Sequence, residues 1–129
     1  MKKKYLIVVA DYYKVISNDL IKSALNIIPK SSNIKIIKVP GVFEIPVTIS
    51  KNLKKYDAFI ALGCVIKGQT PHFDFISQAA TNAIMDLSIE SNKPVGNGII
   101  TCLNMKQAKA RKKKGTEAAN AVISVLSQS

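Results

Sequence analysis

Apolar runs alternate with segments of helical spacing along the whole chain. Strand-like runs occupy residues 4–10, 33–39, 57–66 and 94–102. The first of them, "KYLIVVA", is a continuous apolar run, as a strand covered on both faces needs, whereas the second, "NIKIIKV", alternates. Between and after these runs, apolar residues recur every three to four positions, which predicts helices. The predicted helices cover residues 19–28, a stretch through Val47, Ile49 and Leu53, residues 73–90, and residues 105–126 with an interruption at Gly115.

The order of these elements predicts the fold class. Strands and helices alternate along the chain, which is typical of a parallel sheet that carries helices on both faces. The length of 129 residues suits one compact domain. We therefore expect a single α/β domain over residues 1–129, built as three layers around a four-stranded parallel sheet.

The loops that follow the predicted strands contain the most unusual sequences. They hold Asp11-Tyr12-Tyr13, "PGVFE" at 40–44, "KGQTPH" at 67–72, and the stretch near 102–104. Because the carboxyl ends of parallel strands share one edge of the sheet, we expect these loops to lie together. Ligands of open α/β sheets bind at that edge, so the sequence predicts a site there.

The loop after the third strand has the features of an anion site. Gly68, Gln69 and Thr70 precede a predicted helix, and the free backbone N–H groups of a helix N-terminus favour an anion. A turn in which Thr70 or Asp74 caps the helix explains these residues equally well. His72, the only histidine of the chain, follows. A single histidine is more often an ordinary surface or core residue, but beside a bound phosphate it would serve as a proton shuttle near neutral pH.

Glu44 and two tyrosines are further candidates at this edge. Glu44 lies in the first turn of a predicted helix, where a carboxylate interacts favourably with the helix dipole. Alternatively, it accepts hydrogen bonds from ligand hydroxyls, and Gly41 lets the backbone approach closely. Tyr12 and Tyr13 either pack against the neighbouring loop, or one of them stacks on a flat heterocycle.

The charge of the chain indicates an anionic partner without identifying it. Nineteen Lys and Arg residues against 8 Asp and Glu give a formal net charge of +11, which attracts nucleic acids, acidic surfaces and phosphorylated metabolites alike. Tryptophan is absent, so a base-stacking surface is poorly supported. The run "KQAKARKKKG" is a solvated face, a nucleic-acid patch, or the place where one arginine, Arg111, grips a phosphate through two hydrogen bonds.

Other features of the sequence argue against several classes of protein. No run of 18 or more apolar residues occurs, so we expect no membrane span. Cys64 and Cys102 lack metal or redox spacing and lie in strand-like runs, as reduced, buried cysteines do. The apolar run after the charged residues 1–4 is too short for a secretory signal, so we expect a cytoplasmic protein.

Three segments together resemble one family. They are "VPGVFEIP" at 39–46, "ALGCVIKGQTPHFDFI" at 61–76 and "PVGNGIIT" at 94–101, and their order and spacing are similar to those of the lumazine synthases. The resemblance implies a flavodoxin-like three-layer sandwich. It also implies a transferase that condenses 5-amino-6-(D-ribitylamino)uracil with 3,4-dihydroxy-2-butanone 4-phosphate to 6,7-dimethyl-8-ribityllumazine, the penultimate step of riboflavin biosynthesis. By the same resemblance, no metal or redox cofactor takes part.

The resemblance also implies roles for individual residues. His72 matches the catalytic histidine of the family. The positions that match substrate-binding residues are Tyr12 at the pyrimidine ring, Val42, Phe43 and Glu44 at the ribityl chain, Cys64, Val65 and Ile66 at the strand end facing the pyrimidine, Gln69 and Thr70 in the phosphate loop, and Arg111 at the phosphate.

Two positions depart from the family pattern. Asn97 stands where many members have a phenylalanine that reaches the ligand of a neighbouring subunit. The segment 111–115 is several residues shorter than usual, which leaves Lys112, Lys113 and Lys114 as alternatives to Arg111. The family builds its active sites across the subunit interfaces of a homopentamer, which sometimes assembles further into a shell.

Two other classes of function are consistent with the residues alone. A non-catalytic flavodoxin-like module that binds flavin or nucleotide would use the same loops, and equilibrium binding without turnover would identify it. A basic nucleic-acid-binding protein would show a steep salt dependence of oligonucleotide affinity. Neither class predicts the paired "PGVFE" and "PHFD" segments, so the enzyme is the favoured interpretation.

Overall fold

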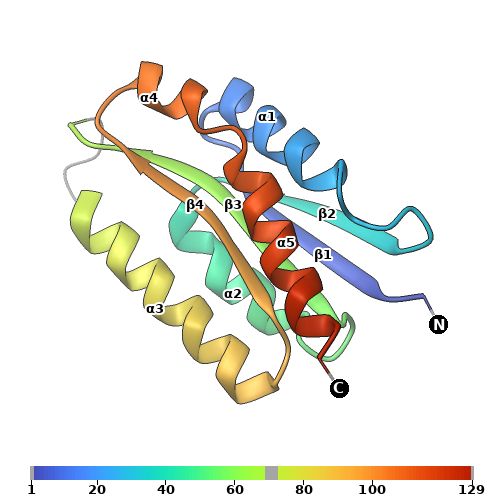
Figure 1. The fold of residues 1–129 in the computed structure, drawn as a ribbon. Coiled ribbons are helices and arrows are strands. Elements are labelled where there is room, and N and C mark those ends of the chain that lie inside the picture. Colours follow the sequence, from blue (N-terminus) through green and yellow to red (C-terminus); the bar gives the residue numbers. More distant parts are fainter. Residues whose placement is uncertain (1, 69–72, 129) are drawn as a thin grey trace.

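Four strands form one parallel sheet in the computed structural model, which describes residues 2–68 and 73–128 (Figure 1). The strands are β1 (Lys4–Ala10), β2 (Asn33–Val39), β3 (Ala58–Ile66) and β4 (Val95–Cys102), arranged in the order β2-β1-β3-β4. Every strand pair is parallel, and Leu6 of β1 pairs with Lys35 on one side and Phe59 on the other. The predicted α/β class and the four-stranded parallel sheet are therefore confirmed.

Helices cover both faces of this sheet. On one face lie α1 (Lys14–Leu25), α4 (Met105–Ala110) and α5 (Lys114–Leu126), and on the other lie η1 (Val42–Glu44), α2 (Ile45–Lys51) and α3 (Phe73–Ser91). Strand β3 is buried along its whole length. Its side chains alternate between the two faces, so that Ile60 and Leu62 pack under α1 and α5, whereas Phe59 and Ala61 pack under α2 and α3.

The predicted start of the first helix is wrong. Helix α1 begins at Lys14 rather than Asp19 and ends at Leu25. Its buried stripe includes a polar residue, Ser17, which conceals the apolar spacing in the first turns. The Ser17 hydroxyl is satisfied locally because it donates a hydrogen bond of 2.7 Å to the Ala10 carbonyl oxygen at the end of β1.

The predicted helix interruption at Gly115 is also wrong. The break between α4 and α5 falls at 111–113, and Gly115 lies inside the first turn of α5. A Cβ atom at Gly115 would overlap the Leu20 carbonyl oxygen and the Ser23 hydroxyl of α1. Glycine is required here because two helices approach each other closely, not because a helix ends.

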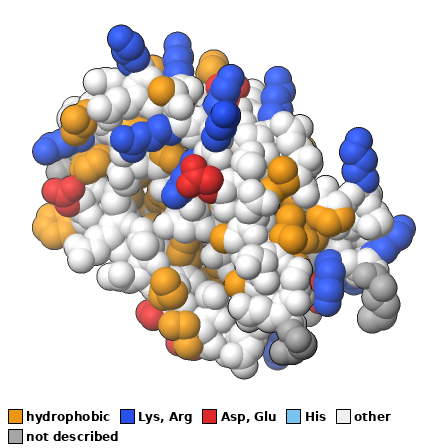
Figure 2. Space-filling model, viewed as in Figure 1, with side chains coloured by type: hydrophobic (Ala, Val, Ile, Leu, Met, Phe, Trp, Pro, Cys, Tyr) orange, Lys and Arg blue, Asp and Glu red, His pale blue; other side chains and the backbone are white. Residues whose placement is uncertain are grey.

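The surface carries many more basic than acidic side chains. Figure 2 shows lysine and arginine side chains spread over the upper part and the right side of the face that carries α4 and α5, with few acidic side chains between them. Among the described residues, no helix combines the length and apolar character that crossing a membrane requires.

Candidate active site

An apolar cavity of about 260 Å³ lies at the carboxyl ends of β1, β2 and β3. The segments that follow β1 and β2 line it together with the end of β3 and α3, through Tyr12, Tyr13, Gly41, Val42, Phe43, Glu44, Cys64, Val65 and Ile76. This is the edge at which the sequence predicts a site. The volume is slightly below the roughly 300–1,000 Å³ of most ligand sites.

Two tyrosines form one end of this cavity. The rings of Tyr12 and Tyr13 make a T-shaped pair with centroids 4.8 Å apart and planes at 84°. Tyr13 packs partly into the core, and burial, with smaller contributions from Tyr12 and Cys64, raises the pKa of its hydroxyl. Tyr12 is 68% exposed. Tyr12 is therefore the ring that is open for stacking on a flat ligand.

Glu44 supplies the carboxylate of this cavity. The extended backbone of Gly41 leads into η1, whose first residue, Val42, is buried, while Phe43 is exposed. A Cβ atom at Gly41 would lie 3.2 Å from Glu44 Oε1, so the carboxylate lies close to the Gly41 backbone. Thr48 Oγ1 donates a 2.8 Å hydrogen bond to the Glu44 carbonyl oxygen and fixes the start of α2. The half-buried carboxylate is thus held as an acceptor beside mainly apolar walls.

The end of β3 contributes two of its three predicted residues. Cys64 and Val65 line the cavity, but Ile66 is 1% exposed in the core cluster that also contains Ala108 of α4. Burial, together with the neighbouring Cys102 thiol, raises the pKa of Cys64 to about 12. Cys64 is therefore a neutral wall of the cavity rather than a nucleophile.

The thiol of Cys64 is expected to resist alkylation in the native protein. Because its pKa rises from 9.0 to about 12, its thiolate fraction at pH 8 should be roughly a thousandfold lower than that of an exposed cysteine. Between pH 9 and 12 the folded protein keeps this proton and the unfolded chain loses it, so stability should fall as pH rises through that window.

Peptide mapping after iodoacetamide treatment measures this reactivity, and the same treatment in urea, where both cysteines are accessible, is the control. Rapid labelling of Cys64 in the native protein at pH 8 would contradict the assignment.

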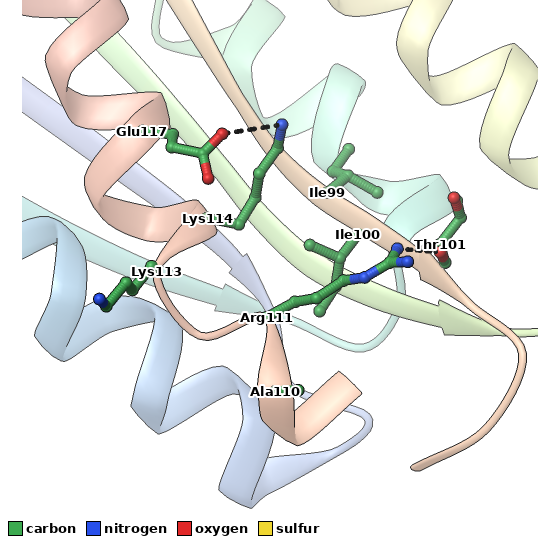
Figure 3. A pocket seen from close by; sticks show the side chains of 8 residues that line it. All are labelled: Ile99, Ile100, Thr101, Ala110, Arg111, Lys113, Lys114 and Glu117. Atoms are coloured by element: carbon green, nitrogen blue, oxygen red, sulfur yellow. Dashed lines mark hydrogen bonds and ion pairs between the residues drawn. The ribbon is translucent and has the colours of Figure 1, made fainter. Parts of the chain in front are cut away.

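A second, cationic cavity of about 430 Å³ lies between β4 and the connection from α4 to α5 (Figure 3). Its lining residues are Ile99, Ile100, Thr101, Ala110, Arg111, Lys113, Lys114 and Glu117. Arg111 Nη1 donates a 2.9 Å hydrogen bond to the Thr101 carbonyl oxygen. Lys114 Nζ lies 3.7 Å from Glu117 Oε1. The remaining N–H groups of Arg111 give this cavity donors that a phosphate needs, whereas the Lys113 side chain points toward α1, away from Arg111 (Figure 3).

Among the described residues the two cavities share no lining residue: Arg111 lines one and Glu44 the other. Asn97 lines neither cavity. It is exposed on β4, a strand at the edge of the sheet, and its Oδ1 accepts a 3.0 Å hydrogen bond from the Ile99 N–H. Asn97 thus satisfies a backbone donor at that edge.

Three predicted residues, Gln69, Thr70 and His72, lie outside the described residues. Before them, Gly68 has a φ of 85°, a left-handed conformation that favours glycine. After them, α3 starts at Phe73.

Several lining residues were not assigned to the site from the sequence. The sequence pattern gives no individual role to Ile76, Thr101 or Glu117. The signal at Glu117 is its spacing from Lys114, because side chains three residues apart meet on a helix. The signal at Ile76 is its place in the helix turn that follows the "PHFD" segment.

Comparisons with known proteins identify the family of this chain. The family model for 6,7-dimethyl-8-ribityllumazine synthase matches residues 2–129. The protein of that name from Bartonella bacilliformis is 44% identical over 115 residues, which cover 85% of this chain and 76% of that protein. Its counterparts from Bartonella henselae and Methylobacterium radiotolerans are 42% and 40% identical, over 97% and 95% of this chain and 87% and 80% of their own lengths.

Proposed function

The chain belongs to the 6,7-dimethyl-8-ribityllumazine synthase family, and we propose that its two cavities are the two halves of the active site. The enzyme is a transferase of riboflavin biosynthesis, which condenses 5-amino-6-(D-ribitylamino)uracil with 3,4-dihydroxy-2-butanone 4-phosphate. The contrast between the cavities supports the proposal: one is apolar with one carboxylate and the other is cationic. The apolar cavity complements a flat pyrimidine whose ribityl chain carries hydroxyl groups, and the cationic cavity complements a phosphate ester.

In the apolar half, Tyr12 stacks on the pyrimidine ring and Glu44 accepts hydrogen bonds from ribityl hydroxyls. Val42 holds the turn in the core, so that Phe43 and Glu44 face the ligand. Cys64 and Val65 form the wall behind the ring. The protonated Cys64 thiol places no negative charge beside the uracil.

In the cationic half, Arg111 grips the phosphate of the second substrate. Because Arg111 and Glu44 line different cavities, with no described lining residue in common, we place Arg111 of one subunit against Glu44 of its neighbour in a homopentamer. The exposed Phe43 and Phe75 suit such an interface because both present large apolar side chains at the rim. Asn97, on the outer strand β4, then belongs to the subunit that contributes Arg111.

The chemistry needs proton transfers where the two substrates meet. His72 is proposed to move protons as the uracil amine condenses with the ketone and as phosphate leaves. Gln69, Thr70 and the start of α3 bind the phosphate group. Holding both substrates in register supplies a further large part of the rate. Neither the flavin- or nucleotide-binding module nor the nucleic-acid-binding protein gains support from the observations above. A cytoplasmic location stays a prediction.

A direct assay tests the proposed reaction. The purified oligomer is incubated with both substrates, and formation of the fluorescent lumazine is followed over time. Reactions that lack one substrate, or contain heat-denatured protein, are the controls for the uncatalysed condensation. A rate with protein equal to the uncatalysed rate would overturn the proposed function.

Glu44→Gln should weaken binding of the ribitylaminouracil by about 1–2 kcal/mol, because one charged acceptor becomes a neutral one of the same shape. The KM for the butanone phosphate should hardly change. Calorimetric titration with a pyrimidine analogue measures the first quantity, and steady-state kinetics measures the second. An equal loss for both substrates would instead indicate a folding defect at the start of α2, which Thr48 also stabilises.

A further inference from the structure

The basic residues of the cationic cavity lie at the junction of α4 and α5, where the N-terminus of α5 has no side-chain cap from its own N-cap residue. Helix α4 ends at Ala110 and α5 begins at Lys114, so Arg111, Lys112 and Lys113 form the whole connection. The residue at the N-cap position of α5, Lys113, makes no side-chain capping hydrogen bond. The first turn of a helix has N–H groups that need outside acceptors, and an N-cap side chain usually bonds one of them.

Ser23 of α1 supplies the missing acceptor from a different helix. Its Oγ accepts a 3.1 Å hydrogen bond from the Thr116 N–H in the first turn of α5. The same hydroxyl donates a 2.6 Å hydrogen bond to the Lys112 carbonyl oxygen. Thr116 Oγ1 donates a 2.7 Å hydrogen bond to the Ser23 carbonyl oxygen. One serine therefore links the middle of the basic connection to the first turn of α5.

The other side-chain contacts of this segment are weaker anchors. The ion pair between Lys114 and Glu117 spans 3.7 Å, with side chains 38% and 67% exposed, and an exposed pair of this kind contributes little. Arg111 donates one hydrogen bond to the Thr101 carbonyl oxygen. The position of its guanidinium group along β4 therefore also depends on where the backbone of residue 111 lies. Because Ser23 bonds the carbonyl of Lys112, it fixes the backbone directly beside Arg111 and Lys113.

We propose that Ser23 is a positioning residue for the phosphate-binding half of the active site. It caps α5 from α1 and so holds the backbone that carries Arg111 at a fixed distance from the phosphate. The inference rests on the proposed function, because it assumes that this segment binds the phosphate of the second substrate. A shift of about 1 Å in a group that orients a substrate is enough to change binding and rate.

Ser23→Ala tests this role without weakening α1 itself, because alanine is the best helix former. The KM for the butanone phosphate and the inhibition constant of inorganic phosphate should both rise roughly 3- to 10-fold, which is the size of one lost capping bond. The KM for the ribitylaminouracil should stay within about twofold, since Ser23 does not line the apolar cavity. The Thr116 amide should exchange its hydrogen faster in the variant.

Two control variants separate positioning from general stability. Thr116→Val removes the bond from Thr116 Oγ1 to Ser23 but keeps the Ser23 contact with Lys112. It should lower the melting temperature and leave the phosphate constants unchanged. Ser127→Ala removes a hydroxyl that bonds only the Ile123 carbonyl in its own helix end, and should change neither.

The outcomes distinguish the inference from the function on which it rests. If Ser23→Ala leaves both phosphate constants at the wild-type values, or if Thr116→Val raises them equally, Ser23 has only a structural role and the inference is overturned. If Arg111→Ala also leaves the inhibition constant of phosphate unchanged, the assignment of the cationic half to phosphate fails as well. A rise with Ser23→Ala and Arg111→Ala, but not with the controls, supports both.

Discussion

Replacing His72 by alanine is expected to lower kcat for the condensation roughly 10- to 1000-fold, the usual range for losing a general acid–base group or somewhat less. The physical reason is that both imine formation and phosphate release need proton transfers at the junction of the two substrates. His72 supplies the only imidazole of the chain. Some activity should survive, because the variant still holds the substrates in register.

The measurement combines kinetics with binding. Steady-state rates give kcat, and calorimetry gives the affinity for a pyrimidine analogue, which should change far less. The wild-type kcat should depend on pH in the range where histidine titrates, and the variant should lose that dependence. Unchanged kcat in the variant would remove His72 from the mechanism, and an equal loss of analogue affinity would indicate a disturbed loop instead.

Replacing Arg111 by alanine should raise the KM for the butanone phosphate roughly 100-fold, because a charge-assisted pair of hydrogen bonds is lost. Lys113→Ala is the matched control, since it removes a cation from the same cavity but not a planar pair of donors. Lys112 does not line the cavity, so Lys112→Ala should have the smallest effect. All variants are compared at one salt concentration, because salt screens exposed charges.

Mixed oligomers test whether Arg111 serves a neighbouring subunit. His72→Ala subunits and Arg111→Ala subunits are unfolded together and refolded as mixed rings. If the two residues come from different subunits, part of the interfaces regain both wild-type residues, and activity should exceed that of either variant alone. Activity no higher than the average of the two variants would place both residues in the same subunit.

If Lys113→Ala loses more phosphate affinity than Arg111→Ala, the lysine is the phosphate ligand.

Strands β1 and β3 were predictable because the sheet is covered on both faces along them, whereas most residues of β2 are exposed or half-buried and its alternating pattern gave the signal. Continuous apolar runs such as that of β3 therefore carry a clear signal, and the observed strands agree with the predicted ones within a residue at each end. The helix boundaries were less predictable where a tertiary contact decides the residue. Ser17 is polar but buried because its hydroxyl bonds the Ala10 carbonyl oxygen at the end of β1, and Gly115 is a glycine inside a helix because α1, distant along the chain, packs closely against it.

The candidate site was predictable only in part for a related reason. The rule that ligands bind at strand carboxyl ends brought Tyr12, Glu44 and Cys64 to one cavity. The rule does not say which strand-end residues a later helix covers, and Ile66 lies in the core with Ala108 of α4. Nor does the rule predict that Arg111 and Glu44 line different cavities, because the place of Arg111 depends on where the connection after α4 turns relative to β4.

The close contact of α1 and α5 at Gly115 makes the short basic connection of residues 111–113 rigid. In a longer, free loop, the position of the cations would depend on the thermal motion of the loop. Here the backbone that carries them is pressed against a helix whose other face is embedded in the core, at Leu20 and Ala24. Substitutions that move α1 by a fraction of an ångström should therefore change phosphate affinity, although α1 does not bind the phosphate. Insertion of a longer loop at 111–114 should make phosphate affinity independent of the position of α1.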